Sequence, residues 1–448
     1  MKAPHPDKLP LTTSLHWFRN DLRAADNEGL TNACKADRVM AVYCFDPRFW
    51  EVGDYGFPRM GPFRSRFLWQ TVAALREELH ALHIPLFVVY GHPEEVLPSL
   101  VVRYHVTTIH TQREWTRDEC IVRDAVAQAL PPEVTLNEYY DQFLFHPDEV
   151  PYGDFGRIPE IFTDFRKRLE ARALVRLPLP TPLPRQAVPG DLEIPPMPGL
   201  AELGIPAGDA DPRSAFPFGG GSREGWQRLQ DYFWEDRRLS DYKKTRNGLV
   251  GTEYSSKFSP WLANGALSAR QIHAEVKRYE REVIANRDTY WLVFELIWRD
   301  YFKYVSLKHG NRIFALSGIR GRRLNWRNQA EALQAWTEGH TGNDFVDANM
   351  RELAATGWMS NRGRQNVASF WAKELRQDWR LGAAWFEYLL LDYDVHSNWG
   401  NWMYNSGVGN DRRDRKFNPN LQAERYDPSG TFRRMWLQPT LFESAPAL

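Results

Sequence analysis

Residues 39–45 have the sequence VMAVYCF, which is apolar at every position and rich in β-branched and aromatic side chains. Such a run is typical of a strand that is buried on both faces of a sheet. Three further runs are also rich in β-branched and aromatic side chains: SLHWF (14–18), PLFVVYG (85–91) and VTTIH (106–110). Apolar residues at helical spacing occupy the intervening and following segments 64–82 and 118–130. Strands that alternate with helices predict an α/β domain over residues 12–140, built on a Rossmann-like, doubly wound parallel sheet.

Sheets of this kind tend to bind ligands at the carboxyl ends of their strands. Neither GxGxxG nor GxxxxGK[ST] occurs anywhere in the chain. A dinucleotide site and a P-loop nucleotide site therefore lose their main sequence support.

The second half of the chain has a different pattern. Residues 178–217 contain eleven of the thirty prolines, and proline interrupts helices and central strands. We therefore expect residues 141–225 to connect two domains, with a Pro-rich, extended part from residue 178. Helical patterns follow without a convincing strand, at 225–247, 268–283, 289–310 and 364–380. They predict an all-α domain over residues 226–440.

The composition narrows the class of protein. The 57 basic and 57 acidic residues cancel, which disfavours a generally basic nucleic-acid-binding protein but not a local basic groove. No apolar run approaches the ~20 residues of a membrane helix, and the N-terminal MKAPHPDKLP lacks a signal-peptide core or a transit peptide. Three separated cysteines form neither a disulfide framework nor a CxxC metal site. We expect a soluble, cytoplasmic protein without membrane partners; in a eukaryote an organelle would be the alternative.

Tryptophan is concentrated in the helical half, where 14 of the 18 residues follow position 225. Most tryptophans pack cores, but those in TYWLVFELIWRDYF (289–302) flank a carboxylate. Four side chains share one helix face through i, i+4, i+7 and i+11 spacing: Trp291, Glu295, Trp298 and Phe302. An unpaired buried carboxylate is costly, so either a basic residue pairs with Glu295 or this face lines a cavity. Trp298 and Arg299 would suit a flat, anionic ligand.

Three polar segments stand out in the same half: GTEYSSKFSPW (251–261), WMSNRGRQN (358–366) and LLLDYDVHSNWGNWMY (389–404). The first places hydroxyl residues around a lysine before a helical pattern, so it is either a phosphate-binding loop or an ordinary helix N-cap. The Asp-x-Asp of the third could bind a divalent metal. Its aromatic surroundings favour no metal, and we expect His396 to be structural.

Together these segments resemble the photolyase/cryptochrome family, and most closely its DASH branch. Seven motifs in the family's order carry the resemblance: WFRNDLR (17–23), DYKKTRNGLVG (241–251), YSSKFSPWLANGALSAR (254–270), FELIWRDYF (294–302), TGWMSNRGRQNVASF (356–370), DYDVHSNWGNW (392–402) and KFNPNLQAERYD (416–427). The resemblance covers nearly the whole chain. It implies an N-terminal α/β domain and a C-terminal helical domain that buries a U-shaped FAD.

The resemblance also assigns residues to FAD. The matches to the loop that holds the FAD phosphates are Tyr242, Ser255, Ser256, Lys257, Phe258 and Ser259. Asp392, Tyr393 and Asp394 match a segment in contact with the flavin and its neighbours. Arg364 is the expected ionic partner of Asp392, and Asn398 matches the residue that faces flavin N5.

Electron transfer follows from the same resemblance. Trp402, Trp379 and Trp326 match the family's three-tryptophan chain. Excited, oxidised flavin can take an electron from a close indole, and successive indoles can carry the hole to the surface.

A substrate pocket is implied as well. In photolyases the light-excited, reduced flavin donates an electron to a cyclobutane pyrimidine dimer, which splits and returns it; the dimer is flipped out of its strand. Glu295 would hydrogen-bond the dimer, and Trp298 and Tyr404 would stack near it. The remaining pocket and DNA positions are Asn361, Arg364 and Gln365, with Arg246 and Arg299 on backbone phosphates.

Features of the DASH branch refine the expectation. Gln365 and Tyr404 stand where typical duplex photolyases have Met and Trp, so we expect a monomeric, FAD-dependent photolyase that prefers dimers in single-stranded DNA. The antenna 5,10-methenyltetrahydrofolate is expected in the cleft between the domains, with Glu114 as its candidate contact. The alternative is a blue-light photoreceptor without repair activity. Asn361 disfavours a (6-4) photolyase, while Asn398 and the lack of a long C-terminal extension disfavour a signalling cryptochrome.

Overall fold

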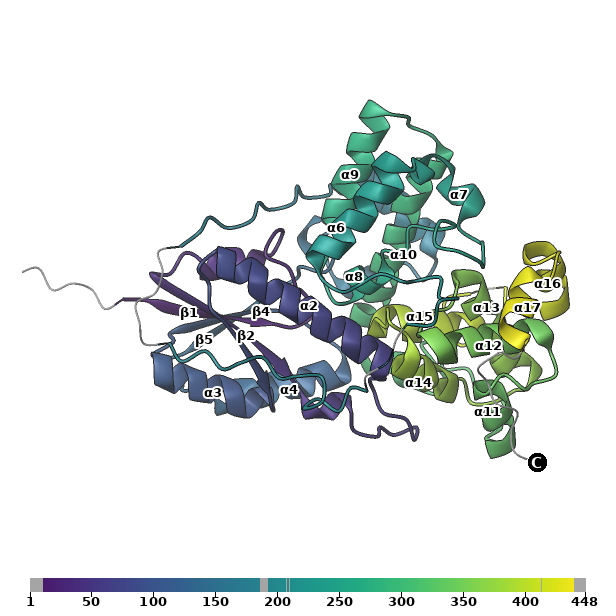
Figure 1. Cartoon of the computed structure of the whole chain (residues 1–448), viewed down its shortest axis with the longest axis horizontal. Coiled ribbons are helices and arrows are strands. Elements are labelled where there is room, and N and C mark those ends of the chain that lie inside the picture. Colours follow the sequence, from purple (N-terminus) through teal and green to yellow (C-terminus); the bar gives the residue numbers. More distant parts are fainter. Residues whose placement is uncertain (1–10, 186–191, 207, 209, 412, 439–448) are drawn as a thin grey trace, which may run out of the picture.

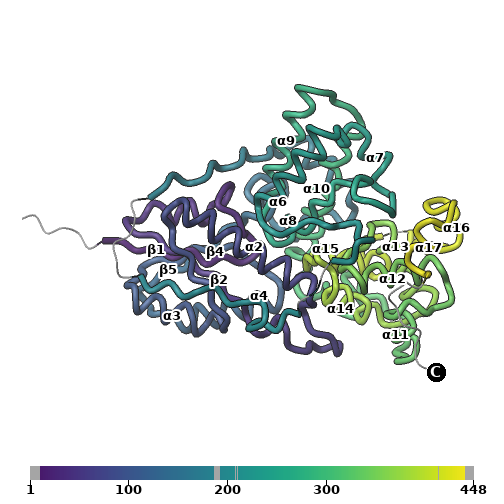
Figure 2. Tube along the Cα trace, viewed as in Figure 1, coloured from purple at the N-terminus to yellow at the C-terminus, as the bar shows by residue number. Residues whose placement is uncertain are grey.

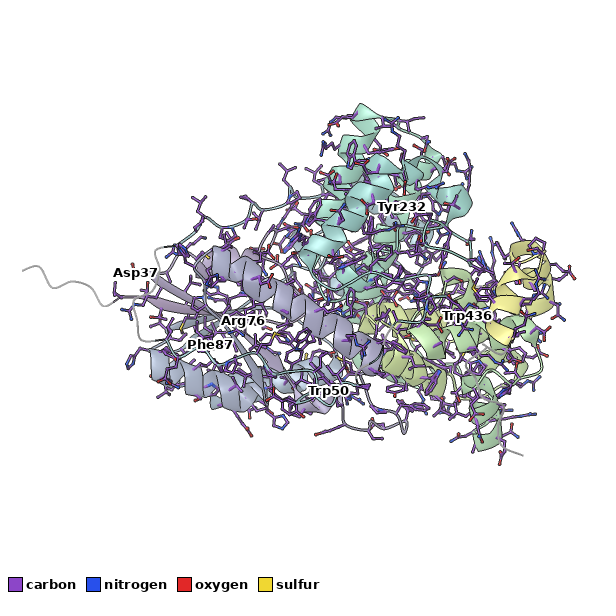
Figure 3. The ribbon with its side chains drawn as sticks, in the orientation of Figure 1. Asp37, Trp50, Arg76, Phe87, Tyr232 and Trp436 are labelled. Carbon is purple, nitrogen blue, oxygen red and sulfur yellow. The ribbon has the colours of Figure 1, made fainter. Side chains whose placement is uncertain are left out.

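The computed structural model describes residues 11–185, 192–206, 208, 210–411 and 413–438. An α/β domain and a larger helical domain pack against each other (Figure 1). Figure 3 labels Phe87 within the first domain and Tyr232 and Trp436 in separate parts of the second, and all three side chains are buried.

Five parallel strands form one sheet in the order β3-β2-β1-β4-β5. Their bounds are Thr13–Phe18 (β1), Arg38–Phe45 (β2), Leu86–Tyr90 (β3), Thr108–Gln112 (β4) and Thr135–Tyr139 (β5). The predicted doubly wound parallel sheet and its four strands are confirmed. The sequence analysis missed β5, a half-exposed edge strand whose residues TLNEY lack an apolar run. Strand order reverses on either side of β1, so a crevice opens at the carboxyl ends of β1 and β4.

Helices cover both faces of this sheet. Their bounds are Glu28–Ala33 (α1), Pro62–Ala81 (α2), Pro93–Tyr104 (α3) and Arg117–Ala129 (α4). Alternate residues of β2 feed two cores: Val39 and Ala41 pack with α1 and α2, whereas Met40 and Val42 pack with α3 and α4. This alternation explains why the whole run 39–45 is apolar. The sequence analysis missed α1, which is short, and α3, which contains Pro98.

Helix α5 (Phe162–Arg172) lies within the stretch expected to connect the domains. Its Phe162, Phe165 and Leu169 belong to the core of the helical domain. Between α5 and residue 222, the described residues form no helix or strand, and the trace in Figure 2 runs along the outside of the α/β domain.

The helical domain contains most of the remaining elements. They are α6 (Ser222–Gln230), the π-helical η4 (Asp231–Glu235), η5 (Arg238–Asp241), α7 (Tyr242–Thr245), α8 (Ser259–Ala263), α9 (Ala269–Glu282), α10 (Arg287–His309), η6 (Gly310–Phe314), α11 (Ala330–Thr337), α12 (Asp344–Thr356), α13 (Asn361–Ser369), the π-helical η7 (Phe370–Glu374), α14 (Trp379–Leu389), α15 (Val395–Ser406), α16 (Pro419–Tyr426) and α17 (Thr431–Leu437). Capping boxes at Ser268 and Asn286 fix where α9 and α10 begin. Among the described residues no strand follows β5, which confirms the all-α prediction.

Two predicted helices are interrupted. The pattern at 364–380 was expected to be one helix, but η7 and a left-handed residue, Arg376 (φ 53°), separate α13 from α14. The pattern at 225–247 divides into α6, η4, η5 and α7, with Arg237 at φ 52°. Helical periodicity continues across both breaks, so it could not reveal them.

Buried charges join the two domains. Arg270 of α9 lies 2.8 Å from Asp26 and 3.4 Å from Asp141 of the α/β domain. Arg23 donates hydrogen bonds to the carbonyls of Gly265, Asp26 and Asp141. Gly265 adopts φ +79°, and a side chain there would collide with the backbone of residues 20 and 21. The backbones of the two domains are therefore in direct contact at Gly265.

Among the residues that the structure describes, no helix has the length and apolar character needed to cross a membrane.

Arg270→Met should lower the free energy of unfolding by about 3–5 kcal/mol, because it leaves two buried carboxylates without their cation. The matched control is Lys277→Met on the same helix, where Lys277 pairs with Glu280 at the surface and is 45% exposed; that pair should contribute less than about 1 kcal/mol. Equilibrium denaturation followed by circular dichroism measures both variants. Equal losses in the two would contradict a structural role of the interdomain pair.

Candidate cofactor and substrate sites

The loop before α8 is held from behind by one arginine. Arg228 of α6 is buried, and its guanidinium donates hydrogen bonds to the carbonyls of Thr252, Ser255 and Ser256 and to the Glu253 carboxylate. Within the described residues, no backbone N–H of 255–258 has a hydrogen-bond acceptor. Arg228 therefore uses the carbonyls of the loop and leaves its N–H groups available to an anion.

Lys257 is the distinctive residue of this loop. It adopts φ +61°, its side chain is buried, and its ammonium group has no hydrogen-bond acceptor. The Nζ atom lies 3.4 Å from the centre of the Tyr254 ring and 4.8 Å from that of Trp358. Burial lowers the pKa of Lys257 far below its usual value. A buried cation without an acceptor is costly, and an anionic ligand would relieve that cost.

The other predicted residues of the loop lie together here. Ser255, Ser256, Phe258 and Ser259 are consecutive with Lys257. The Tyr242 hydroxyl interacts with Ser256 and with Arg246, so Tyr242 links this loop to the neighbouring pocket.

A second ionic group lies near Lys257. Arg364 of α13 pairs with Asp392 at 3.0 Å, as predicted, and donates to the carbonyl of Met359 at 2.9 Å. Glu352 of α12 is fully buried, and one of its oxygens has no hydrogen-bond donor. Burial raises the pKa of Glu352 to about 8, against the opposing effect of Lys257 and Arg364. Sequence analysis missed Glu352, because a lone Glu in a helical pattern carries no signal.

Asn398 and Trp402 lie one turn apart on α15. The Asn398 side chain donates to the carbonyl of Ala383 at 2.9 Å, which orients its amide. Trp402 packs on Gly382 of α14 so closely that a Cβ there would lie 2.2 Å from the indole. Trp379 precedes Gly382 by three residues and is fully buried, so both indoles lie along the same side of α14.

Trp326, the third predicted tryptophan, lies in a segment that pairs with the chain before α14. The adjacent Arg327 pairs with the segment before α14, with backbone hydrogen bonds from Arg327 N to Arg376 O (2.7 Å) and from Asp378 N to Arg327 O (2.9 Å). Trp402 and Trp379 are buried, whereas Trp326 is partly exposed. Two of the three predicted tryptophans are therefore core residues, and the third lies nearer the surface; their electron transfer stays a prediction.

The aromatic face of α10 holds the predicted substrate residues. Glu295 pairs with Arg246 at 3.0 Å, and the two side chains keep 27% and 15% of their exposure. Burial raises the pKa of Glu295, and Arg246 opposes the rise. Trp298 stacks on Phe162 at 3.7 Å between ring centres and meets Tyr404 edge-on at 6.1 Å. Of the two alternatives left open for Glu295, the structure shows the basic partner, Arg246, and the carboxylate is also partly exposed.

Helix α13 adds polar residues to the same region. Asn361 is exposed at its first turn, and Gln365 follows one turn later. Arg362 donates to Gln365 at 2.9 Å and to Asn247 at 3.0 Å, which ties α13 to the segment that carries Arg246. Arg362 was not predicted as a site residue, although it lies within the quoted motif NRGRQ.

Arg299 contacts the domain boundary, and its predicted role on a DNA phosphate stays a prediction. Its side chain donates to the carbonyls of Gln142 (2.5 Å) and Leu262 (3.0 Å), so it braces the interdomain contact. Helical spacing separates residues 295 and 299 by one turn, but the long Arg299 side chain extends to the domain boundary.

A cavity of about 390 Å³ lies between the domains, at the crevice beside β1 and β4. Glu114 is buried in its wall and accepts hydrogen bonds from Gln112 (2.6 Å) and Asn20 (3.3 Å). Asp394 also lines this cavity, paired with Lys303 at 2.8 Å, which together with other cations lowers the pKa of Asp394. The predicted antenna residue and Asp394 thus share one cavity.

Two aromatic neighbours complete this wall. His396 is buried, lies 2.7 Å from the Ser306 hydroxyl and stacks on Trp115, and burial keeps its pKa far below the usual range. Tyr393 contacts Arg64 and Trp399 and lines the interdomain cavity. The flavin contact predicted for Tyr393 stays a prediction. In the described part of the chain, no three His, Cys, Asp or Glu residues gather in a metal-binding cluster.

The fold and these sites define a two-domain protein with a buried anion-binding loop, and comparison with known proteins identifies its family. Residues 14–185 match the family model described as DNA photolyase, and residues 291–444 match the FAD binding domain of DNA photolyase. The chain belongs to the photolyase/cryptochrome family, and FAD is its cofactor.

Within that family the similarity is to cryptochrome DASH proteins. The chain is 50% identical to cryptochrome DASH of Gloeobacter violaceus over 97% of its length and 87% of the relative's. Its structure resembles that of the Synechocystis sp. PCC6803 cryptochrome, with a TM-score of 0.90, 46% identity and coverage of 96% and 89% of the two chains. It also resembles an archaeal photolyase from Sulfolobus tokodaii with two FAD molecules, with a TM-score of 0.76, 26% identity and coverage of 95% and 90%.

The residues around Lys257 fit FAD. A pyrophosphate would accept hydrogen bonds from the free N–H groups of the loop and supply the anion that the buried Lys257 ammonium lacks. The Arg364–Asp392 pair adds a fixed donor and acceptor nearby. Arg228 and Lys303, which position the loop and Asp394, were missed because their partners are distant in sequence.

Asp392→Asn should purify with much less FAD than the parent protein, because Arg364 would lose its ionic partner at the buried site. The visible absorbance ratio of flavin to protein after gel filtration measures the loss. Glu170→Gln is the matched control, since Glu170 pairs with Arg166 on the surface of α5. Full flavin content in the folded Asp392→Asn variant would remove Asp392 from the cofactor site.

Proposed function

We propose that the protein is a light-driven, FAD-dependent photolyase that repairs cyclobutane pyrimidine dimers and prefers single-stranded DNA. One observation carries this proposal: a carboxylate, an aromatic platform and a cation converge at one partly open site. Glu295 and Arg246 form its polar side, and Trp298 with Tyr404 its aromatic side.

FAD supplies an electron to the dimer after light absorption, and the residues of the chain select and hold the dimer. Trp298 offers a π-face for a flipped pyrimidine, and its stack on Phe162 keeps that face in position. Glu295 can hydrogen-bond a pyrimidine through its carboxyl group. A carboxyl in this partly desolvated place would matter most as negative charge builds on the dimer carbonyls.

The preference for single strands rests on Gln365 and Tyr404. These polar side chains make the pocket less apolar, so it gains less from extracting a dimer out of a stacked duplex. Dimers in single strands cost less to unstack. We further propose that the protein acts as a monomer and that Asn361 and Arg364 belong to the same pocket.

The interdomain cavity is our proposed antenna site. Its buried Glu114 offers a carboxylate that could pair with the N–H groups of the pterin in 5,10-methenyltetrahydrofolate. The archaeal neighbour's name records a second FAD, so a flavin is the competing occupant; extraction and chromatography of the bound chromophores distinguish the two.

A blue-light photoreceptor without repair activity is the second candidate function, and the sequence of aromatic residues from Trp402 to Trp326 would serve it equally. A receptor has no need of Glu295 and Arg246 beside Trp298. Dimer reversal in irradiated oligo-dT under blue light decides between the two functions.

Glu295→Ala should retain FAD but reverse dimers about 10- to 100-fold less efficiently, since a hydrogen bond to a charged group contributes about 1.5–3 kcal/mol. Glu295→Gln, which keeps a donor, should lie between Ala and the parent. Glu282→Ala, at an exposed pair on α9, is the control. Equal repair yields in the folded, FAD-loaded Glu295→Ala variant and the parent would sink the assigned role; a lower melting temperature alone would mean that Glu295 only neutralises Arg246.

DNA affinity should fall with salt, with a log–log slope near −0.7 per contacted phosphate on single strands. Arg362→Gln should reduce that slope by about 0.7 if its guanidinium contacts one phosphate. Lys277→Gln removes the same charge from the exposed face of α9 and should leave the slope unchanged. Fluorescence anisotropy with dimer-bearing oligo-dT over a salt series measures both, and identical slopes in all three proteins would place the DNA elsewhere.

A further inference from the structure

Trp379 contacts a tryptophan outside the predicted chain of three. Its ring centre lies 5.6 Å from that of Trp399, with the planes at 78°. No comparable ring contact joins Trp379 to Trp326 within the described residues. Trp399 is buried on α15, one turn before Trp402. An electron that leaves Trp379 is therefore replaced most directly from Trp399.

Trp399 leads on to a tyrosine with a carboxylate partner. The Trp399 indole N–H donates to the Tyr393 hydroxyl at 3.3 Å. The same hydroxyl lies close enough to the carboxylate of Glu387 on α14 to oppose the rise in its pKa. The Arg64 guanidinium lies 4.5 Å from the Tyr393 ring centre. Tyr393 and Glu387 both line the interdomain cavity and a smaller one beside it.

We propose that Trp399, Tyr393 and Glu387 form a second branch of the electron chain, which runs from Trp379 to the interdomain cavity and ends in proton-coupled oxidation of Tyr393. The branch rests on the photochemical part of the proposed function, because it needs electrons to be withdrawn through Trp402 and Trp379.

The oxidant is light-excited, oxidised flavin. One electron moves from Trp402 to the flavin, and Trp402 is refilled from Trp379, Trp379 from Trp399, and Trp399 from Tyr393. The O–H bond of Tyr393 then breaks, and its proton passes to the Glu387 carboxylate. The balance is one electron on the flavin, one proton on Glu387 and a neutral radical on Tyr393.

The carboxylate makes Tyr393 a suitable end point, because a phenol that loses an electron must lose its proton to a nearby base. The charged and titratable groups that face Glu387 are Arg64 from α2, Arg59 before it, Glu119 from α4 and the neutral phenol of Tyr393. Burial raises the pKa of Glu387 to about 7 against Arg64 and Arg59. The proton-accepting form of Glu387 therefore increases as the pH rises through neutrality, and the yield of the branch should increase with it.

A different aromatic pair near Trp402 lacks these features. Trp336 lies 6.1 Å from Trp402 and 5.0 Å from Trp371, and both are fully buried. The Trp336 indole N–H has no acceptor, and that of Trp371 donates to the carbonyl of Asp378. Neither indole meets a carboxylate that could take a proton, so a hole placed there would return to Trp402.

The test replaces Trp326, the surface end of the predicted chain of three. It follows photoreduction of the bound FAD under blue light with an external thiol as electron donor. Trp326→Phe should retain part of the parent rate. Trp326→Phe combined with Trp399→Phe should fall to the level of Trp402→Phe, which blocks both branches at their common start. In the Trp326→Phe protein, electron paramagnetic resonance should detect a neutral tyrosyl radical whose yield rises with pH through about 7 and is lost in Tyr393→Phe.

Glu387→Gln should remove the pH dependence and reduce the radical yield, a result that simple packing would not produce. Tyr388→Phe is the matched control, since Tyr388 lies next to Glu387 and its ring contacts Trp385 instead of Trp399. A Trp326→Phe rate equal to that of Trp402→Phe, or a tyrosyl signal that survives Tyr393→Phe, would overturn the branch. Dimer reversal by chemically reduced protein needs neither Trp326 nor Trp399. A failure of that reversal would therefore count against the proposed repair function alone.

Discussion

Arg270 lies between two carboxylates of the other domain, and none of the three groups reaches water. Buried charges are stable only when an opposite charge lies close to them in a well-defined geometry. The pairs of Arg270 with Asp26 and Asp141 therefore determine how the two domains dock. Gly265 permits the backbones to meet there, and Arg299 braces the same boundary from α10. The cavity between the domains, and the walls that Tyr393 and Glu387 contribute to it, exist only in this arrangement.

The cofactor region has the opposite character, because its polar groups are buried without complete partners. Lys257 has a left-handed backbone conformation, and its ammonium group has no hydrogen-bond acceptor. One carboxylate oxygen of Glu352 has no hydrogen-bond donor. Folded proteins leave few such groups. Arg228 and Gly382 show how the chain supports this arrangement: one fixes the loop through its carbonyls, and the other lets an indole approach helix α14. The free-energy cost of these unpartnered buried groups indicates that a ligand binds here and supplies their missing partners.

Sequence analysis predicted what depends on local pattern. The apolar run 39–45 predicted a central strand, and the alternation of strands with helices predicted the parallel sheet. Strand β5 was not predicted, because an edge strand need not be apolar. Helical spacing placed Glu295 and Trp298 on one face, but could not show that the Arg299 side chain extends to the domain boundary. The helix breaks at Arg237 and Arg376 depend on left-handed backbone conformations, which the spacing of apolar residues does not reveal. Family resemblance supplied Arg364 and Asp392, but not Arg228, Glu352 or Arg362, whose roles come from contacts between distant segments.

The walls of the interdomain cavity come from both domains, with Glu114 on one side and Lys303 and Asp394 on the other. A molecule bound there acts as a non-covalent cross-link, because it cannot keep its contacts if the domains separate. Mass action then adds about 1.4 kcal/mol to the docked state for each tenfold excess of the free molecule over its Kd. Supply of that small molecule in the cell would thereby adjust the lifetime of the folded protein.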